Sequence, residues 1–313
     1  MKKFILLFFL LTLIIISAAN AQVSEEFRNN YTKAENYMSD ENYADALRVF
    51  LYLDTLTPGN PNVTFNIGVC YVNSMLEKSK AIPYLEKAVE NVSLDYIGVA
   101  DDITAPIFAF YYLGRAYLII YKLDDAIKYF EKFKYYLTEN DVDLLKDVNR
   151  QIEMCYNAKK LMLNPVSITI ENLGEPINSS FPDYSPVITP DETSVIFTSR
   201  REGSSCGKKD TDGKFFEDIY VANLGKEKKG WGVGFSKIGS NINTCGHEAS
   251  ISISQDGKQL FIYRDDNGDG NIYISELKNS EWTTPDKLSF EINSKYWETH
   301  TCLSPDGYTL YFV

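Results

Sequence analysis

Three acidic residues recur at one position of an internal repeat, which makes them candidates for a shared binding site. Asp183, Glu248 and Glu298 each stand eight residues before the aspartate of a predicted turn. Equivalent positions in a ring of repeats converge on its axis, so the carboxylates could form an acidic mouth that binds a cation or a basic partner segment. The alternative is structural, with each carboxylate accepting backbone N–H groups from the next repeat.

A second acidic pattern resembles a calcium loop. Residues 265–270 read Asp-Asp-Asn-Gly-Asp-Gly, and Glu276 falls at the twelfth position of such a loop. The predicted flanks are strands rather than helices, and Tyr273 occupies the ninth position, where a ligand would help. Because a solvated turn has the same composition, we assign no metal here.

Other catalytic or metal-binding patterns are weak. The pairs Cys245-Gly-His247 and His300-Thr-Cys302 have short spacing for zinc and lie at non-equivalent repeat positions. Gly-x-Ser-x-Gly, a Walker loop and a dinucleotide-binding glycine motif are absent from the sequence. We therefore expect a protein with no cofactor and no catalytic residues.

Charge and the N-terminus indicate where the protein works. The net charge of −12 over 313 residues disfavours a nucleic-acid partner. Lys2 and Lys3 precede an apolar run over residues 4–16, and Ala19-Asn20-Ala21 follows as a small-x-small cleavage site. Residues 1–21 therefore read as a secretory signal peptide, and we expect no transmembrane segment once it is removed.

Export leaves the pairing of the five cysteines open. An oxidising compartment permits disulfides, and an odd number leaves at least one thiol unpaired. Cys70 and Cys155 lie in helical patterns and read as small buried hydrophobes. Cys206 and Cys245 lie in Gly/Ser/Asn-rich loops, where a bridge is one alternative; Cys302 is the fifth cysteine.

Residues 25–163 carry a helical repeat. The clearest copy reads Phe110-x₂-Leu113-Gly114-x₂-Tyr117, with Ala126 and Phe130 downstream. Small residues at two positions let antiparallel helices approach, and aromatic side chains fill the rest of the groove. A second copy includes Thr64, Ile67, Gly68 and Tyr71, and a first includes Ala34, Tyr37, Ala46 and Phe50. We expect an insertion near residues 95–106 and a capping helix over residues 141–163.

This stretch resembles the tetratricopeptide repeat family. Members bind partner peptides or proteins in a concave groove lined by the first helix of each repeat. The resemblance implies that the groove shows Tyr31, Phe65 and Tyr111, with Glu35, Val69 and Arg115 one turn further on. The alternative is that the aromatic residues pack against neighbouring repeats.

From residue 164 the hydrophobic period changes to two, which is typical of strands. Residues 164–177 read as a linker and first strand. Three strand-turn-strand stretches then align over 183–197, 248–261 and 298–312, and in two of them a third strand follows. Asp-Gly between alternating runs favours a hairpin. Residues 178–313 resemble the Tol-associated (TolB-type, WD-like) β-propeller, with two blades and part of a third, so we expect the chain to be a fragment of a longer protein.

The predicted fold class is α + β multidomain, with an N-terminal α-helical tetratricopeptide solenoid followed by a partial β-propeller. This domain order resembles Bacteroidetes envelope proteins that end in an OmpA-like peptidoglycan-binding domain, some of which, the PorE-like ones, serve type IX secretion. The resemblance implies a non-catalytic periplasmic scaffold that is outer-membrane-associated and binds envelope proteins or peptides. It would reach peptidoglycan only through a domain not present here. Two alternatives stay open: the N-terminal part of an exported serine peptidase, and a secreted binding protein with no wall link.

Overall fold

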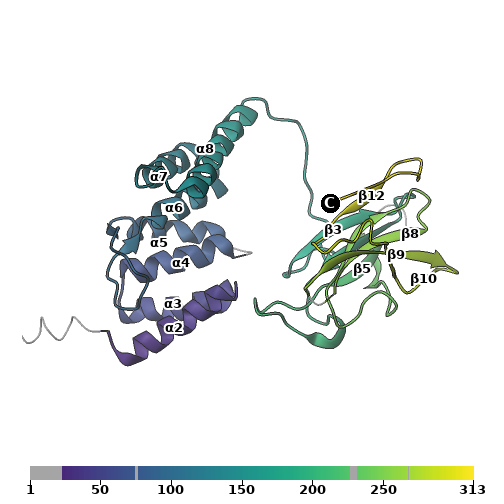
Figure 1. Ribbon diagram of the computed structural model, residues 1–313, viewed down its shortest axis with the longest axis horizontal. Helices are drawn as coiled ribbons and strands as arrows, with labels where there is room; N and C mark the ends of the chain where they lie inside the picture. Colours follow the sequence, from purple (N-terminus) through teal and green to yellow (C-terminus); the bar gives the residue numbers. More distant parts are fainter. Residues whose placement is uncertain (1–22, 75–76, 226–230, 267) are drawn as a thin grey trace, which may run out of the picture. The chain divides into compact units, whose positions relative to one another are not determined.

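The computed structural model describes residues 23–74, 77–225, 231–266 and 268–313, and it divides the chain into two compact units, Met1–Ser167 and Ile168–Val313 (Figure 1). The predicted signal peptide lies outside the described residues. Within those ranges, no helix combines the length and the apolar character needed to cross a membrane.

The first unit is a series of helices in which each packs against the next (Figure 1). Ser24 and Asn60 cap two of these helices by accepting hydrogen bonds from their first-turn N–H groups. The helices are α2 (Glu25–Ser39), α3 (Tyr43–Leu56), α4 (Pro61–Asn73), α5 (Ala81–Ala88), α6 (Phe108–Ile119), α7 (Leu123–Tyr135) and α8 (Val142–Met162), with the short 3₁₀ helix η1 (Lys78–Lys80) before α5.

Small residues allow the helices of a pair to approach closely. A Cβ atom added at Gly68 of α4 would lie 2.3 Å from Cγ of Leu85 in α5. A Cβ atom at Gly114 of α6 would lie 2.7 Å from the ring of Phe130 in α7. Ala34 holds the corresponding place in α2 and is fully buried. This packing confirms the tetratricopeptide-like architecture predicted for the helical region.

The predicted insertion lies between α5 and α6 and has structure of its own. Strand β1 (Val92–Ser93) pairs in parallel with β2 (Ala105–Pro106). Between these strands, the Tyr96 hydroxyl donates to Oδ1 of Asn62 at 2.7 Å, and Nδ2 of Asn62 donates to the Val99 carbonyl at 2.9 Å. The insertion is therefore fastened to the first turn of α4.

The second unit is made of antiparallel sheets. The first sheet has the order β3-β4-β5-β6, the second has the order β10-β9-β8-β7 with β11 also on β9, and the third is the hairpin β12-β13. The strands are β3 (Asp183–Ile188), β4 (Ser194–Ser199), β5 (Asp218–Leu224), β6 (Trp231–Lys237), β7 (Glu248–Ile253), β8 (Gln259–Asp265), β9 (Gly270–Lys278), β10 (Glu281–Trp282), β11 (Asp286–Lys287), β12 (Thr301–Leu303) and β13 (Leu310–Phe312). A four-stranded meander of this kind is the form of a propeller blade.

Turn chemistry and apolar faces explain these sheets. Gly257 and Gly307 take positive φ values of 71° and 76° in the Asp-Gly turns. Glu192 adopts φ 56° at the equivalent position without the freedom of glycine. The first two sheets share one apolar core, formed by Val187, Ile196, Ile219, Ile242, Leu260 and Ile262. The sheets therefore pack face against face, which brings the starts of β3 and β7 together.

Candidate functional site

The three repeated acids bind the loops that precede their strands. In each repeat, the carboxylate accepts hydrogen bonds from the backbone N–H and the hydroxyl of a serine or threonine four residues earlier. These partners are Ser179 for Asp183 (2.6 and 2.8 Å), Thr244 for Glu248 (3.2 Å from the N–H) and Ser294 for Glu298 (3.0 and 2.7 Å). The donors come from the acid's own loop, rather than from the next repeat as the structural alternative supposed.

The side chains of these acids are largely buried. The Asp183 side chain is 8% exposed and accepts a hydrogen bond from Arg201 at 2.7 Å. Burial opposes ionisation, yet the hydrogen bonds from Ser199 and Arg201 lower the pKa of Asp183. The Glu248 side chain is 1% exposed, and burial raises the pKa of its carboxyl group. These contacts give the acids a structural role, whereas their role in partner binding stays a prediction.

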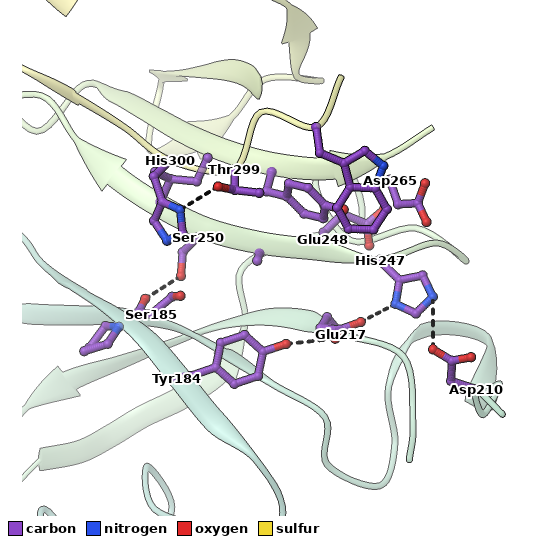
Figure 2. Close-up of a pocket in the computed structure, with 15 residues that line it drawn as sticks. Tyr184, Ser185, Asp210, Glu217, His247, Glu248, Ser250, Asp265, Thr299 and His300 are labelled. Atoms are coloured by element: carbon purple, nitrogen blue, oxygen red, sulfur yellow. Dashed lines mark hydrogen bonds and ion pairs between the residues drawn. The ribbon is translucent and has the colours of Figure 1, made fainter. Parts of the chain in front are cut away.

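A pocket of about 650 Å³ opens beside Glu248 (Figure 2). Its walls come from β3, the loop between β4 and β5, the start of β7, the end of β8 and the segment before β12. Asp210, Glu217 and Asp265 line it together with Glu248. Among the described residues that line the pocket there is no lysine or arginine. We call this site the mouth pocket.

Aromatic side chains form another part of the lining. Tyr263 and Trp297 lie with ring centroids 6.5 Å apart. Trp297 is 59% exposed, and its indole N–H donates to the Gly268 carbonyl at 2.9 Å. An indole face held beside carboxylates can bind a cation through both charge and the ring quadrupole. The mouth pocket thus has the chemistry to bind an ammonium or guanidinium group.

His247 and Glu217 form the polar centre of one wall (Figure 2). Nδ1 of His247 is hydrogen-bonded to the Glu217 carboxylate, which also accepts a bond from the Tyr184 hydroxyl at 2.8 Å. The hydrogen bond to the Glu217 carboxylate raises the pKa of His247. Burial would raise the pKa of Glu217, but the bond to His247 and the charge of Arg200 hold it below its ordinary value. The pair therefore favours an imidazolium beside a carboxylate.

The loop between β4 and β5 is covalently fastened near this wall. A disulfide joins Cys206 of that loop to Cys245, two residues before His247, with the Cα atoms 5.4 Å apart. Cys70 and Cys155 are buried thiols, as their helical patterns predicted, and Cys302 is exposed.

The sequence patterns did not single out Asp210 and Glu217, although the loop that carries them is long compared with the tight β8–β9 turn.

No described group of three or more His, Cys, Asp or Glu residues is arranged to hold a metal ion. In the calcium-like loop, Asp266 instead accepts hydrogen bonds from Tyr273 at 2.6 Å and Lys287 at 3.0 Å. Asn267, the central residue of that pattern, lies outside the described residues. Cys245 belongs to a disulfide in this structure, so it is not a thiolate ligand for zinc.

Tyr31 and Phe65, two of the residues predicted to line the groove of the helical unit, are buried instead. Tyr31 is 1% exposed and donates to Oδ1 of Asn62 at 2.8 Å, the atom that also binds Tyr96 of the insertion. Phe65 is 8% exposed and meets the rings of Tyr96 and Tyr112 edge-on. These two aromatic residues pack within the unit, which is the alternative that the sequence left open.

The other predicted groove residues differ in exposure. Val69 is buried at 3% exposure, whereas Glu35, Tyr111 and Arg115 are half-buried. The Tyr111 hydroxyl donates to Asp147 of α8 at 2.6 Å, and the Arg115 guanidinium lies 5.5 Å from the centre of the Tyr112 ring. Parts of Glu35, Tyr111 and Arg115 therefore remain open to solvent.

Solved structures that resemble this chain include a tetratricopeptide domain. The tetratricopeptide domain of Sgt2 from Aspergillus fumigatus is similar at 15% identity, over 50% of this chain and 96% of that chain, with a TM-score of 0.34. No family model matches the chain, and no curated protein matches it.

Proposed function

We propose that this protein is a non-catalytic scaffold whose mouth pocket binds a positively charged segment of a partner protein. The observation that carries the proposal is the pocket lining, which combines four carboxylates with exposed indole surface and, among the described lining residues, has no basic side chain beyond two histidines. Arg200, behind the lining, lies 3.7 Å from Asp210 and 3.5 Å from Glu217, and Arg264 lies 3.5 Å from the buried Glu248, so the charge of these three carboxylates is partly compensated. Such a site discriminates by charge and attracts cationic partners from a distance.

The Ser250 hydroxyl has a structural role in this unit. Of the two serines that line the pocket, Ser250 donates to the Ser185 carbonyl at 2.8 Å and lies 3.2 Å from the Thr198 hydroxyl. Its oxygen is thus engaged in joining β3, β4 and β7. In an exported peptidase the catalytic residues would belong to a further domain, and the mouth pocket would still be a docking site.

The proposed setting is the periplasmic face of the outer membrane. The apolar N-terminal run and the order of tetratricopeptide-like and TolB-type repeats support this assignment, as does the disulfide, which suits an oxidising compartment. By the same resemblance, a further OmpA-like domain would link the protein to peptidoglycan, and type IX secretion is the process it would serve.

Charge neutralisation tests the proposed binding site. A short lysine-rich peptide should bind the chain, and replacing Asp210 and Asp265 with asparagine should weaken binding by up to about thirtyfold, because each exposed ion pair contributes up to about 1 kcal/mol. Fluorescence anisotropy of a labelled peptide measures the effect. Glu281→Gln, which removes an exposed acid of β10 outside the pocket, is the matched control. Equal binding of a glutamate-rich peptide would contradict the proposal.

A further inference from the structure

The exposed indole of Trp297 is held in place by contacts on two sides. Its N–H donates to the Gly268 carbonyl in the β8–β9 turn at 2.9 Å. The next residue, Glu298, donates its backbone N–H to the Gly270 carbonyl at 3.0 Å, and its buried carboxylate accepts two hydrogen bonds from Ser294. The indole is therefore a fixed aromatic surface, although it is 59% exposed.

Tyr263 lies beside this ring and is positioned by the same turn. A Cβ atom added at Gly270 would lie 2.6 Å from the Tyr263 ring, so the ring packs directly against the glycine backbone. The rings of Tyr263 and Trp297 are inclined at 55°, and both line the mouth pocket. Together they form an aromatic surface on which a planar cation can stack.

The carboxylate of Asp265, which lines the pocket (Figure 2), is held by the same glycine as the Trp297 indole. Oδ1 of Asp265 accepts the Gly268 N–H at 2.5 Å, while the Gly268 carbonyl accepts the indole N–H. Oδ2 of Asp265 makes no hydrogen bond to another described residue. The turn therefore places an open carboxylate oxygen beside a fixed aromatic face.

The other three carboxylates of the pocket already have a cationic neighbour within 4.0 Å. These pairs are Arg200 with Asp210 and with Glu217, and Arg264 with Glu248. Asp265 forms no ion pair with a described residue. Of the four carboxylates, Asp265 is therefore the one whose charge is left for a partner to neutralise.

We propose that the partner segment presents an arginine to the mouth pocket, with its guanidinium stacked on the Trp297 indole and paired with the Asp265 carboxylate. This inference rests on the proposed function and names the side chain that the pocket selects. A guanidinium is planar and more weakly hydrated than an ammonium, so it can stack on a ring while its edge donates to a carboxylate. A lysine ammonium can pair with Asp265, but it is a compact, strongly hydrated charge that cannot stack flat on the indole.

Two peptides that differ only in having arginine or lysine at each cationic position test this inference. The arginine peptide should bind the whole chain about fivefold more tightly, because a cation stacked on an accessible ring adds a contact of that size. Trp297→Leu should abolish the preference and leave binding of the lysine peptide within about twofold of wild type, since the ion pair with Asp265 remains. Fluorescence anisotropy of the labelled peptides measures both affinities.

Tyr296→Leu is the matched control for Trp297→Leu. Tyr296 is an exposed aromatic residue of the same segment and is not among the residues that line the pocket, so its replacement should keep the arginine preference. Asp265→Asn is a second, independent variant. It should weaken binding of the arginine peptide more than binding of the lysine peptide, because a guanidinium can pair with a carboxylate through two hydrogen bonds.

Equal binding of the two peptides by the wild type would overturn the inference and leave the proposed function intact. An arginine preference that survives Trp297→Leu unchanged would also overturn it, because the preference would then not come from the indole. Failure of both peptides to bind would overturn the proposed function, and the inference with it.

Discussion

Gly68→Ala should destabilise the helical unit by about 1–3 kcal/mol, the cost of overpacking a close-packed core. The added Cβ would lie 2.3 Å from Leu85 in the facing helix, so the two helices of the pair must separate. The sign of this change in the free energy of unfolding is diagnostic, because alanine in a helix interior is otherwise favoured over glycine by about 1 kcal/mol. Urea unfolding followed by circular dichroism measures the change.

A double-mutant cycle with Leu85→Ala separates the clash from other effects of Gly68→Ala. Once the leucine side chain is removed, Gly68→Ala should cost nothing or stabilise the unit, because contacting residues couple non-additively. If Gly68→Ala is equally destabilising in both backgrounds, close approach at this position is not what joins α4 to α5.

Loss of the Cys206–Cys245 disulfide should lower the stability of the β unit by about 2–4 kcal/mol. The bond closes a loop between residues 39 apart and fastens the β4–β5 loop beside His247. The double variant Cys206→Ser/Cys245→Ser and the wild type under reductant should therefore show the same drop in the midpoint of denaturant unfolding. The variant should also bind the lysine-rich peptide more weakly, because Asp210 and Glu217 lie on the freed loop.

Cys302→Ser is the matched control for this prediction. Cys302 is an exposed thiol on β12 and is not bonded to another cysteine, so its replacement should leave the midpoint unchanged. An unfolding midpoint that is insensitive to reductant would show that the loop is held by its polar contacts alone, such as those of Arg200 with Asp212 at 2.8 and 3.0 Å.

Local signals were sufficient to predict the helices and hairpins. The positions of Gly68, Gly114 and Ala34 follow from steric need within a helix pair, and Asp-Gly turns follow from backbone conformation. Both are short-range constraints that repeat along the chain. The sequence therefore predicted the α + β layout and the place of the insertion between α5 and α6.

The mouth pocket and the filled helical groove depend on contacts between distant segments. Glu217, at the end of the β4–β5 loop, contacts His247 just before β7, and Tyr96 reaches Asn62 from an insertion that has no periodic pattern. Irregular loops can adopt many conformations, so contacts of this kind cannot be predicted from hydrophobic periodicity. The repeated acids were visible in the sequence, but their serine and threonine partners four residues earlier were not singled out.

The most direct test of the account is a hydrogen-exchange footprint of the whole chain with the lysine-rich peptide bound. We predict slower exchange in β3, in residues 247–251 and in residues 297–300, which surround the mouth pocket. Exchange in α2, α4 and α6 should not change. Protection confined to those helices, with none around the mouth pocket, would contradict the account and place binding in the helical unit.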